Sequence, residues 1–478
     1  MGVGDVSRSI HDYLDLVDAL QQSISPQPGH DFEVNYCEID GMLEKIANLE
    51  TQFRLGRSKL QNIRNQSRVL IPPNRLPTEI FSYIFYLCFQ SEAEPVDPQL
   101  WDEDATPDDD TQSIISVGPQ VCHHWRDVIL GTHKLWTSID LSSPASLYDA
   151  DLALKRSKTL PLAIYLDLVL EEGEGWHKPA LDLLRPHMSR CRELSMHANN
   201  LEAMGHAVHQ LTKSGDMPLL RDVTLTSREA GEVLSLGETA ISLFTAMTQA
   251  VDYLHLLGVF LPWESRSFTN LVGLTLTHID DTRAPTPAQM ETILRSCPLL
   301  EYLELEDIAP LLPPVEPPTF TSPSSIVMKA LDTVKVQRVG VPIFHHIADV
   351  ISAPALTTVL FADSVGRPRA GLSEVEFGAH SALFSLTSAS HAVSLQYLSI
   401  ELGTWSSSEF IRLLKPLESL QDLRLSLMKG VDNILAGLVS EGCCTDLCAL
   451  TLIECYSQDA SLFKAIRKLA SDPERESH

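Results

Sequence analysis

The residues whose types could support chemistry are densest in the segment VCHHWRDVILGTHKLW, residues 121–136. Four potential metal ligands occur there: Cys122, His123, His124 and His133. Two ligands on a helix share a face when they are four residues apart, whereas consecutive residues point about 100° away from one another. Three of these ligands are consecutive and the fourth follows Gly131, so their spacing argues against a metal centre.

The apolar residues of the same segment fit an ordinary core helix. Its predicted buried stripe is formed by Val121, Trp125 and Val128. Gly131 is expected to end the helix, and Cys122 to pack beside the stripe as a small hydrophobic residue. His123 and His124 are expected to point away from the stripe.

The rest of the chain offers no enzyme signature. None of the patterns GxSxG, GxxxxGK[ST], HExxH and GxGxxG occurs in a fitting context. The adjacent pairs His345–His346 and Cys443–Cys444 do not converge on one point in any regular element. We therefore expect a non-catalytic protein that carries no cofactor and no metal.

Composition limits the class of partner. The chain has 478 residues, 44% of them hydrophobic and 21% charged, which is typical of a globular protein with two or three structural units. Its 63 acidic residues against 36 Lys and Arg give a net charge of −27, which argues against nucleic acid. We expect no membrane span and no secretory signal. The nine scattered cysteines predict reduced thiols, and hence a cytoplasmic or nuclear protein.

The N-terminal region contains a heptad pattern. Ten positions between Ile39 and Leu70 alternate in steps of three and four, and eight of them are apolar. This pattern predicts a coiled-coil-like helix over residues 36–71, after a tail with a short helix over residues 1–35. Self-association through this seam and packing of a single helix on its own chain are both compatible with the pattern.

The segment PPNRLPTEIFSYIFYLCF, residues 72–89, predicts a second helix, with Pro77 and Glu79 in its first turn. It carries two apolar stripes, one of Ile80, Ile84 and Leu87 and one of Phe81, Phe85 and Cys88. A helix that is apolar on two sides needs two surfaces to pack against. Residues 91–113 contain nine Asp or Glu and no Lys or Arg, which predicts a disordered acidic loop.

From residue 191 the template L-x-x-L-x-L recurs ten times, at intervals of 20 to 39 residues. Its copies begin at residues 191, 220, 251, 271, 300, 331, 356, 395, 420 and 447. Leucine-rich repeats have a period of about 20–29 residues with one strand and one crossover each. A doubly wound α/β domain would instead need longer apolar strands and a glycine-rich phosphate turn. The prediction is an α/β solenoid with a curved parallel sheet over residues 142–470, followed by a tail over 471–478.

The connections between these templates also carry signals. In TPAQMETILRSCPLLEYLEL, Thr286 is expected to cap a helix, with Pro287 in its first position and Gln289 completing a capping box. The longer intervals imply insertions, of which the Pro-rich segment 310–325 is one.

The two helical segments, RLPTEIFSYIFYLC and VCHHWRDVILGTHKLWTSIDL, together resemble the F-box. This three-helix motif docks onto the Skp adaptor of cullin–RING ubiquitin ligases. The matching residues are Leu76, Pro77, Glu79, Ile80, Ile84, Phe85, Val121, Cys122, Trp125, Arg126, Leu135 and Trp136. The order of parts resembles that of the F-box proteins of mushroom-forming (basidiomycete) fungi. It runs from a heptad helix, through an F-box over 72–141 that is split by an acidic loop, to degenerate repeats. The chain departs from the family in its acidic insertion, in Gly118–Pro119, and in the histidines at 123 and 124.

The resemblance implies a substrate-recognition subunit of a cullin–RING (SCF-type) ligase in the ubiquitin-conjugation pathway. The repeats would bind a protein substrate, and the F-box would bind the Skp-type adaptor. The residues that the resemblance assigns to the adaptor contact are Leu76, Pro77, Ile80, Ile84, Val121, Cys122 and Trp125. The alternative is a non-catalytic scaffold with the same coiled coil and solenoid outside a ligase complex.

The repeat template also predicts a substrate surface. Its leucines face the core, so the residues between them face outward and form rows on the concave face when strands stack. The candidate residues are Tyr253, His255, Thr275, Tyr302, Glu304, Glu306, Lys335, Tyr397, Glu401 and Arg424. Tyr302 beside the carboxylates of Glu304 and Glu306 predicts complementarity to a basic substrate segment. A solvated face without a ligand is the alternative.

Overall fold

The computed structural model describes residues 11, 14–15, 18–19, 36–66, 72–93, 113–168, 176–199, 201–212, 217–227, 251–264, 268–279, 282–308, 325–362, 376–388, 394–403, 405–428 and 430–455. The chain divides into two compact units, one of residues 1–136 with 156–158 and one of residues 137–155 with 159–478. Most of the acidic loop, of the Pro-rich insertion and of the two terminal tails lies outside the described residues. None of the described helices is long and apolar enough to cross a membrane.

The first unit begins with helix α2, Tyr36–Gln66, over the described part of the heptad segment. A 3-10 turn, Pro72–Arg75, then leads into helix α3, Thr78–Ala93. The heptad positions Ser67 and Leu70 lie outside the described residues. The helix itself is therefore present, and its pairing as a coiled coil stays a prediction.

The segment after the acidic loop forms two helices, not one. Helix α4 spans Ile114–Val121 and helix α5 spans His123–Gly131. Cys122 between them is extended, with φ −163° and ψ 169°, so the single helix expected from Val121 to Val128 was wrong. A side chain at Gly118 would overlap the Cδ1 atom of Ile129. The break at Cys122 thus allows α5 to fold back against Gly118 of α4. Gly131 ends α5, as predicted.

The second unit is built on a parallel sheet of twelve described strands, which lie side by side in chain order. They are β1 Ser138–Leu141, β2 Leu162–Leu168, β3 Cys191–Ala198, β4 Asp222–Ser227, β5 Tyr253–Leu257, β6 Gly273–Thr277, β7 Tyr302–Glu306, β9 Thr333–Gln337, β11 Thr358–Ala362, β12 Tyr397–Gly403, β13 Asp422–Met428 and β14 Ala449–Ile453. Parallel neighbouring strands require a crossover between them. A sheet whose strands lie in the same order as along the chain has the topology of a solenoid.

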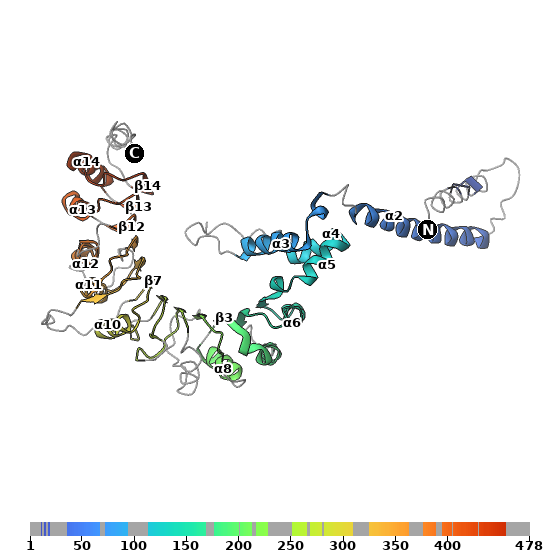
Figure 1. The fold of residues 1–478 in the computed structure, drawn as a ribbon, viewed down its shortest axis with the longest axis horizontal. Helices are drawn as coiled ribbons and strands as arrows, with labels where there is room; N and C mark the ends of the chain where they lie inside the picture. The colour runs from blue at the N-terminus through green and yellow to red at the C-terminus, as the bar shows by residue number, and fades with distance from the viewer. Residues whose placement is uncertain are drawn as a thin grey trace. The chain divides into compact units, whose positions relative to one another are not determined.

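Helices form most of the described crossovers of this unit. They are α6 Ser146–Arg156, α7 His177–Leu184, the 3-10 helix Arg185–Arg190, α8 Leu201–Thr212, α10 Pro287–Ser296, α11 Val341–Val350, α12 Glu376–Ser388, α13 Ser407–Leu414 and α14 Val431–Glu441. From β3 to β14 the strands follow the inner side of an arc, and α8 and α10 to α14 lie along its outer side (Figure 1). A separate two-stranded parallel ladder joins β8, Ile326–Val327, to β10, Ile351–Ser352.

The leucines of the repeat template hold the sheet to the helices. Leu225, Leu276, Leu305 and Leu425 are each 0% exposed, as predicted. These four lie in one continuous line, because successive strands pair without a shift in register from β3 onward. Leu452, the equivalent residue of β14, is only partly buried, so its predicted burial was wrong. It lies in the last described strand, which has a described neighbour on one side only.

The sheet contains two strands that the template did not reveal. The ten templates correspond to the strands from β3 to β14 of the main sheet, and β1 and β2 precede them. Their segments, SIDL and LAIYLDL, keep the alternation of buried residues but lack the first leucine of the template. The described sheet therefore begins at Ser138, inside the range 72–141 predicted for the F-box.

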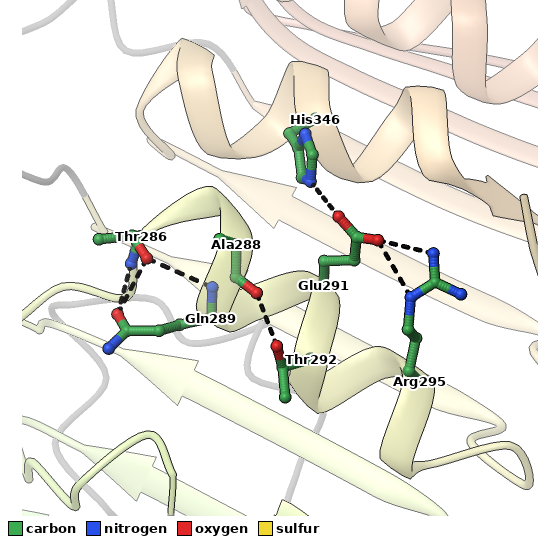
Figure 2. A network of polar contacts seen from close by, with 7 residues as sticks. All are labelled: Thr286, Ala288, Gln289, Glu291, Thr292, Arg295 and His346. Carbon is green, nitrogen blue, oxygen red and sulfur yellow. Dashed lines mark hydrogen bonds and ion pairs between the residues drawn. The ribbon is translucent and has the colours of Figure 1, made fainter. Parts of the chain in front are cut away.

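Helix α10 shows how the crossovers begin and end. The Thr286 hydroxyl accepts from the backbone N–H of Gln289, and the Gln289 side chain accepts from the backbone N–H of Thr286 (Figure 2). This is the predicted capping box, with Pro287 in the first turn. The helix then buries Met290, Ile293 and Leu294 against the sheet side of the repeat. Reciprocal capping satisfies two backbone donors that the helix itself cannot pair.

A polar network on the outer side connects neighbouring crossovers. Glu291 of α10 accepts from Arg295 at 2.6 and 3.0 Å and from Nε2 of His346, in α11, at 2.9 Å (Figure 2). The hydrogen bond from Arg295, ahead of that from His346, lowers the pKa of Glu291 below its ordinary value of 4.5. Adjacent repeats are thus joined by a charge contact in addition to their apolar core.

We expect Thr286→Ala to destabilise the second unit by about 1 kcal/mol, because it removes the side chain that caps α10. Thr292→Ala is the matched control, since the Thr292 hydroxyl bonds only the carbonyl of Ala288 within the helix. Urea unfolding followed by circular dichroism measures both variants. Equal midpoints for the two variants would contradict the capping role.

We expect Glu291→Gln to lower stability at neutral pH and to have little effect at acid pH. A carboxyl group with a lowered folded pKa contributes stability above its unfolded pKa, near 4.5, and loses it as pH falls through the folded value. The unfolding midpoint of the variant should therefore lie below that of the wild type at pH 7, and the two midpoints should agree at pH 3. A constant difference at both values would count against a role for the charge.

Candidate protein-binding surfaces

Helix α3 uses one of its two apolar stripes to build the core of the first unit. Phe81 and Phe85 are 3% and 2% exposed. Both rings meet Trp125 of α5, edge to face, with centroid distances of 5.3 and 5.2 Å. His124 also stacks on Phe81, at 5.6 Å, so its predicted orientation away from the core was wrong. Cys88, which the sequence placed on this stripe, is exposed.

The other stripe of α3 stays exposed. The exposed apolar residues here are Leu76, at 37%, Ile80, at 49%, Ile84, at 38%, and Leu87, at 46%. Val121, at the end of α4, is 45% exposed, and Pro77 is exposed as well. We call Leu76, which precedes α3, together with Ile80, Ile84 and Leu87 of the helix, the α3 stripe. Exposed apolar side chains that recur along one helix face are typical of a surface that another protein covers.

The remaining candidates for the adaptor contact lie behind or beside this stripe. Trp125 is partly buried, because its ring packs against both Phe81 and Phe85, which also contact each other. Cys122 is also partly buried, in the extended link between α4 and α5, which departs from the buried position expected for it. Trp125 is thus suited to support α3 from within, and the α3 stripe is suited to make the contact.

On the second unit, the residues between the leucines form three rows across the sheet. One row joins Asp222, Tyr253, Gly273, Tyr302, Thr333, Thr358, Tyr397 and Asp422. The second joins Thr224, His255, Thr275, Glu304, Lys335, Leu360, Ser399 and Arg424. The third joins Thr226, Leu257, Thr277, Glu306, Gln337, Ala362, Glu401 and Ser426. All ten candidate substrate residues fall on these rows.

The middle row contains a chain of polar contacts. Lys335 Nζ lies 2.6 Å from one carboxylate oxygen of Glu304. The other oxygen accepts from the Tyr302 hydroxyl at 2.8 Å and, more distantly, from the Thr275 hydroxyl at 3.4 Å. The Thr275 hydroxyl also lies 2.9 Å from Nδ1 of His255. Four neighbouring strands are thereby connected on the concave face.

The carboxylates of the predicted basic-ligand patch are already paired inside the chain. Glu304 bonds Lys335, and Glu306 bonds the Arg338 guanidinium. Their side chains are only 14% and 19% exposed. Burial, with the charge of Glu304, raises the pKa of Tyr302, so its hydroxyl remains a donor throughout the neutral range. A basic ligand would have to displace these internal cations in order to reach the two carboxylates.

The structure adds a set of charged turn residues that sequence reasoning missed. His278, Asp307 and Arg338 directly follow β6, β7 and β9 and adopt positive φ of 54°, 54° and 51°. Asp307 lies 3.7 Å from His278 Nε2 and 3.6 Å from Arg338 Nε. Their spacing after each template was visible in the sequence, but non-glycine residues give no signal for left-handed backbone.

The other predicted residues lie away from this network along the rows. Tyr397 and Glu401 belong to β12 and Arg424 to β13, and all three are partly buried. Arg424 is in register with Ser399, between Tyr397 and Glu401 on the neighbouring strand. In the described part of the chain, no group of three or more His, Cys, Asp or Glu could hold a metal ion.

Comparison with known proteins shows a distant structural similarity. No protein-family profile matches the sequence, and no curated protein matches it. Among solved structures, the chain is similar to the leucine-rich-repeat-containing protein LegL7 from Legionella pneumophila, with 10% sequence identity and a TM-score of 0.31. That similarity covers 70% of this chain and 97% of the other. The description of the second unit as a repeat solenoid therefore rests on its own parallel sheet.

We expect Lys335→Met to destabilise the second unit by about 1–3 kcal/mol, because it leaves the mostly buried carboxylate of Glu304 without its cation. The double variant Glu304→Gln with Lys335→Met should recover much of that loss. Lys155→Met is the matched control, since Lys155 and Asp151 form an ion pair that is 69% and 40% exposed. Urea unfolding compares all three, and a double variant less stable than Lys335→Met would contradict this account.

Proposed function

We propose that the chain is the substrate-recognition subunit of an SCF-type cullin–RING ubiquitin ligase. In this proposal the helices α3 to α5 form an F-box that binds a Skp-type adaptor, and the solenoid binds the protein to be ubiquitinated. The observation that carries the proposal is the exposed α3 stripe, which lies on a different face of the helix from the buried Phe81 and Phe85. Its residues include Leu76, Ile80 and Ile84, which match the F-box motif.

The packing of α3 supports a docking role for this stripe. The inner aromatic cluster holds α3 against α5 through Phe81, Phe85 and Trp125. The exposed stripe contributes nothing to that cluster, so its apolar residues are available to a partner without unfolding the unit. Burying several exposed apolar side chains of this size can supply several kcal/mol of binding free energy.

The second unit supports a receptor role. Its concave face carries rows of Tyr, His and charged side chains over a leucine core that does not depend on them. Tyrosine supplies large contact area at low entropic cost, which is why it is common in protein-binding surfaces. An adaptor-binding unit on the same chain as a protein-binding solenoid is the arrangement that a substrate receptor requires.

The proposal predicts that Ile80→Ala with Ile84→Ala reduces binding of a purified Skp-type adaptor at least tenfold. Both side chains are exposed, at 49% and 38%, so the fold should persist. Leu219→Ala with Leu299→Ala is the matched control, because these leucines are 42% and 60% exposed and belong to the second unit.

Adaptor affinity is measured by titration calorimetry, with circular dichroism to check that each variant is folded. Leu76→Ala with Pro77→Ala, at the start of α3, should have the same effect as the α3 variant. Undiminished adaptor binding in both α3 variants, or no binding by the unmodified chain, would remove the ligase proposal.

A further inference from the structure

Strand β6 presents only small side chains to the concave face. Its outward residues, Gly273, Thr275 and Thr277, are small, and all five residues of the strand are buried. The strands on both sides carry larger outward side chains, including Tyr253 on β5 and Tyr302 on β7. Small residues stay buried here because side chains from the flanking strands lean over them.

Tyr253 is the side chain that covers Gly273. A Cβ atom on Gly273 would lie 2.5 Å from Cδ1 and 3.1 Å from Cε1 of the Tyr253 ring. The ring therefore rests directly on the backbone of the neighbouring strand, in a position that only glycine permits. Tyr253 is nevertheless 39% exposed. We call this ring on its glycine floor the Tyr253 platform.

A carboxylate adjoins the platform on its other side. Asp222 of β4 is in register with Tyr253, about 4.8 Å away along the sheet. Within the described residues, no side-chain hydrogen bond and no ion pair within 4 Å reaches the Asp222 carboxylate; the nearby ion pairs join Arg192 to Glu193 and Arg221 to Asp252. Burial is the largest influence on the pKa of Asp222 and raises it; the charge of His255, next in size, lowers it, and the smaller effects of Glu193 and Arg192 raise and lower it respectively. An added cation would therefore stabilise this carboxylate.

The contrast with the neighbouring site is informative. Glu304, two strands further along, already has Lys335 at 2.6 Å and the Tyr302 hydroxyl at 2.8 Å. Within the described residues, Asp222 has no cation in direct contact, because the charges of His255 and Arg192 act on it only from beyond 4 Å, so it is the better receptor for a cation from outside. The net charge of −27 also favours association with basic partners.

We propose that the Tyr253 platform and Asp222 form a binding site for an arginine side chain of a protein partner, with the guanidinium stacked on the ring and paired with the carboxylate. Arginine suits this site better than lysine, because its guanidinium is planar, stacks on aromatic faces and matches carboxylate geometry. This inference rests on the proposed receptor role, and it names one chemical feature of the substrate.

A peptide array tests the inference with the full-length chain. Its peptides share randomised flanks and differ only at a central arginine, lysine or citrulline, the last being uncharged. We expect arginine peptides to bind about tenfold more strongly than citrulline peptides, with lysine between them. Equal binding of arginine and citrulline, or stronger binding of lysine than of arginine, would overturn the proposal.

Three variants locate the preference on the structure. Tyr253→Ala removes the platform, Asp222→Asn removes the charge, and Gly273→Ala pushes the ring off its floor while keeping both groups. Each should reduce the preference for arginine over citrulline about three- to tenfold. The Gly273→Ala result is the most specific, because a general attraction between an acidic protein and a basic peptide would not respond to a methyl group.

A control variant lies on the same face. Asp422→Asn removes a carboxylate from the same row but far along the sheet. It should keep the preference for arginine, and an equal loss in Asp422→Asn would overturn the assignment to the Tyr253 platform. Adaptor binding is measured in parallel: if it fails while the arginine preference holds, the ligase proposal falls and this binding site stands.

Discussion

The structure of the second unit depends on the constant register between parallel strands. Each strand from β3 to β14 of the main sheet places its template leucines opposite those of the strand before, so burial on one face repeats without interruption. A shift of one residue would turn every leucine toward solvent. The same register fixes which outward side chains become neighbours. The contact of Glu304 with Lys335 and that of Tyr253 with Gly273 are therefore consequences of leucine packing.

Local patterns in the sequence were sufficient to locate an element wherever one residue type has one physical role. The leucine template located ten of the twelve described strands of the main sheet, and Thr286, Pro287 and Gln289 located the start of α10. β1 and β2 were missed, since their alternation of apolar residues is not accompanied by the first template leucine. The break at Cys122 was missed because apolar spacing across Val121 to Val128 is the same for one helix as for two that meet.

The candidate surfaces were predictable as sets of residues but not as contacts. The rows on the concave face follow from alternation, and all the proposed members lie on them. Internal pairing does not follow from alternation: Arg338, which neutralises Glu306, lies outside the template in a turn. The Tyr253 platform likewise depends on a ring leaning across to the next strand. On α3, two apolar stripes were evident, whereas the choice of Phe81 and Phe85 for the interior depended on the fit to Trp125.

The left-handed turns after β6, β7 and β9 have a consequence for how such a surface can change over generations. The backbone N–H groups of these three turn residues, His278, Asp307 and Arg338, each donate a hydrogen bond to the carbonyl of the last residue of the neighbouring strand. Because the stacked sheet imposes this conformation, the position does not require glycine, and it accepts side chains of either charge at a modest strain of about 1–2 kcal/mol. Mutation at these turns can therefore rewrite the charge along this edge of the sheet while the leucine core remains untouched.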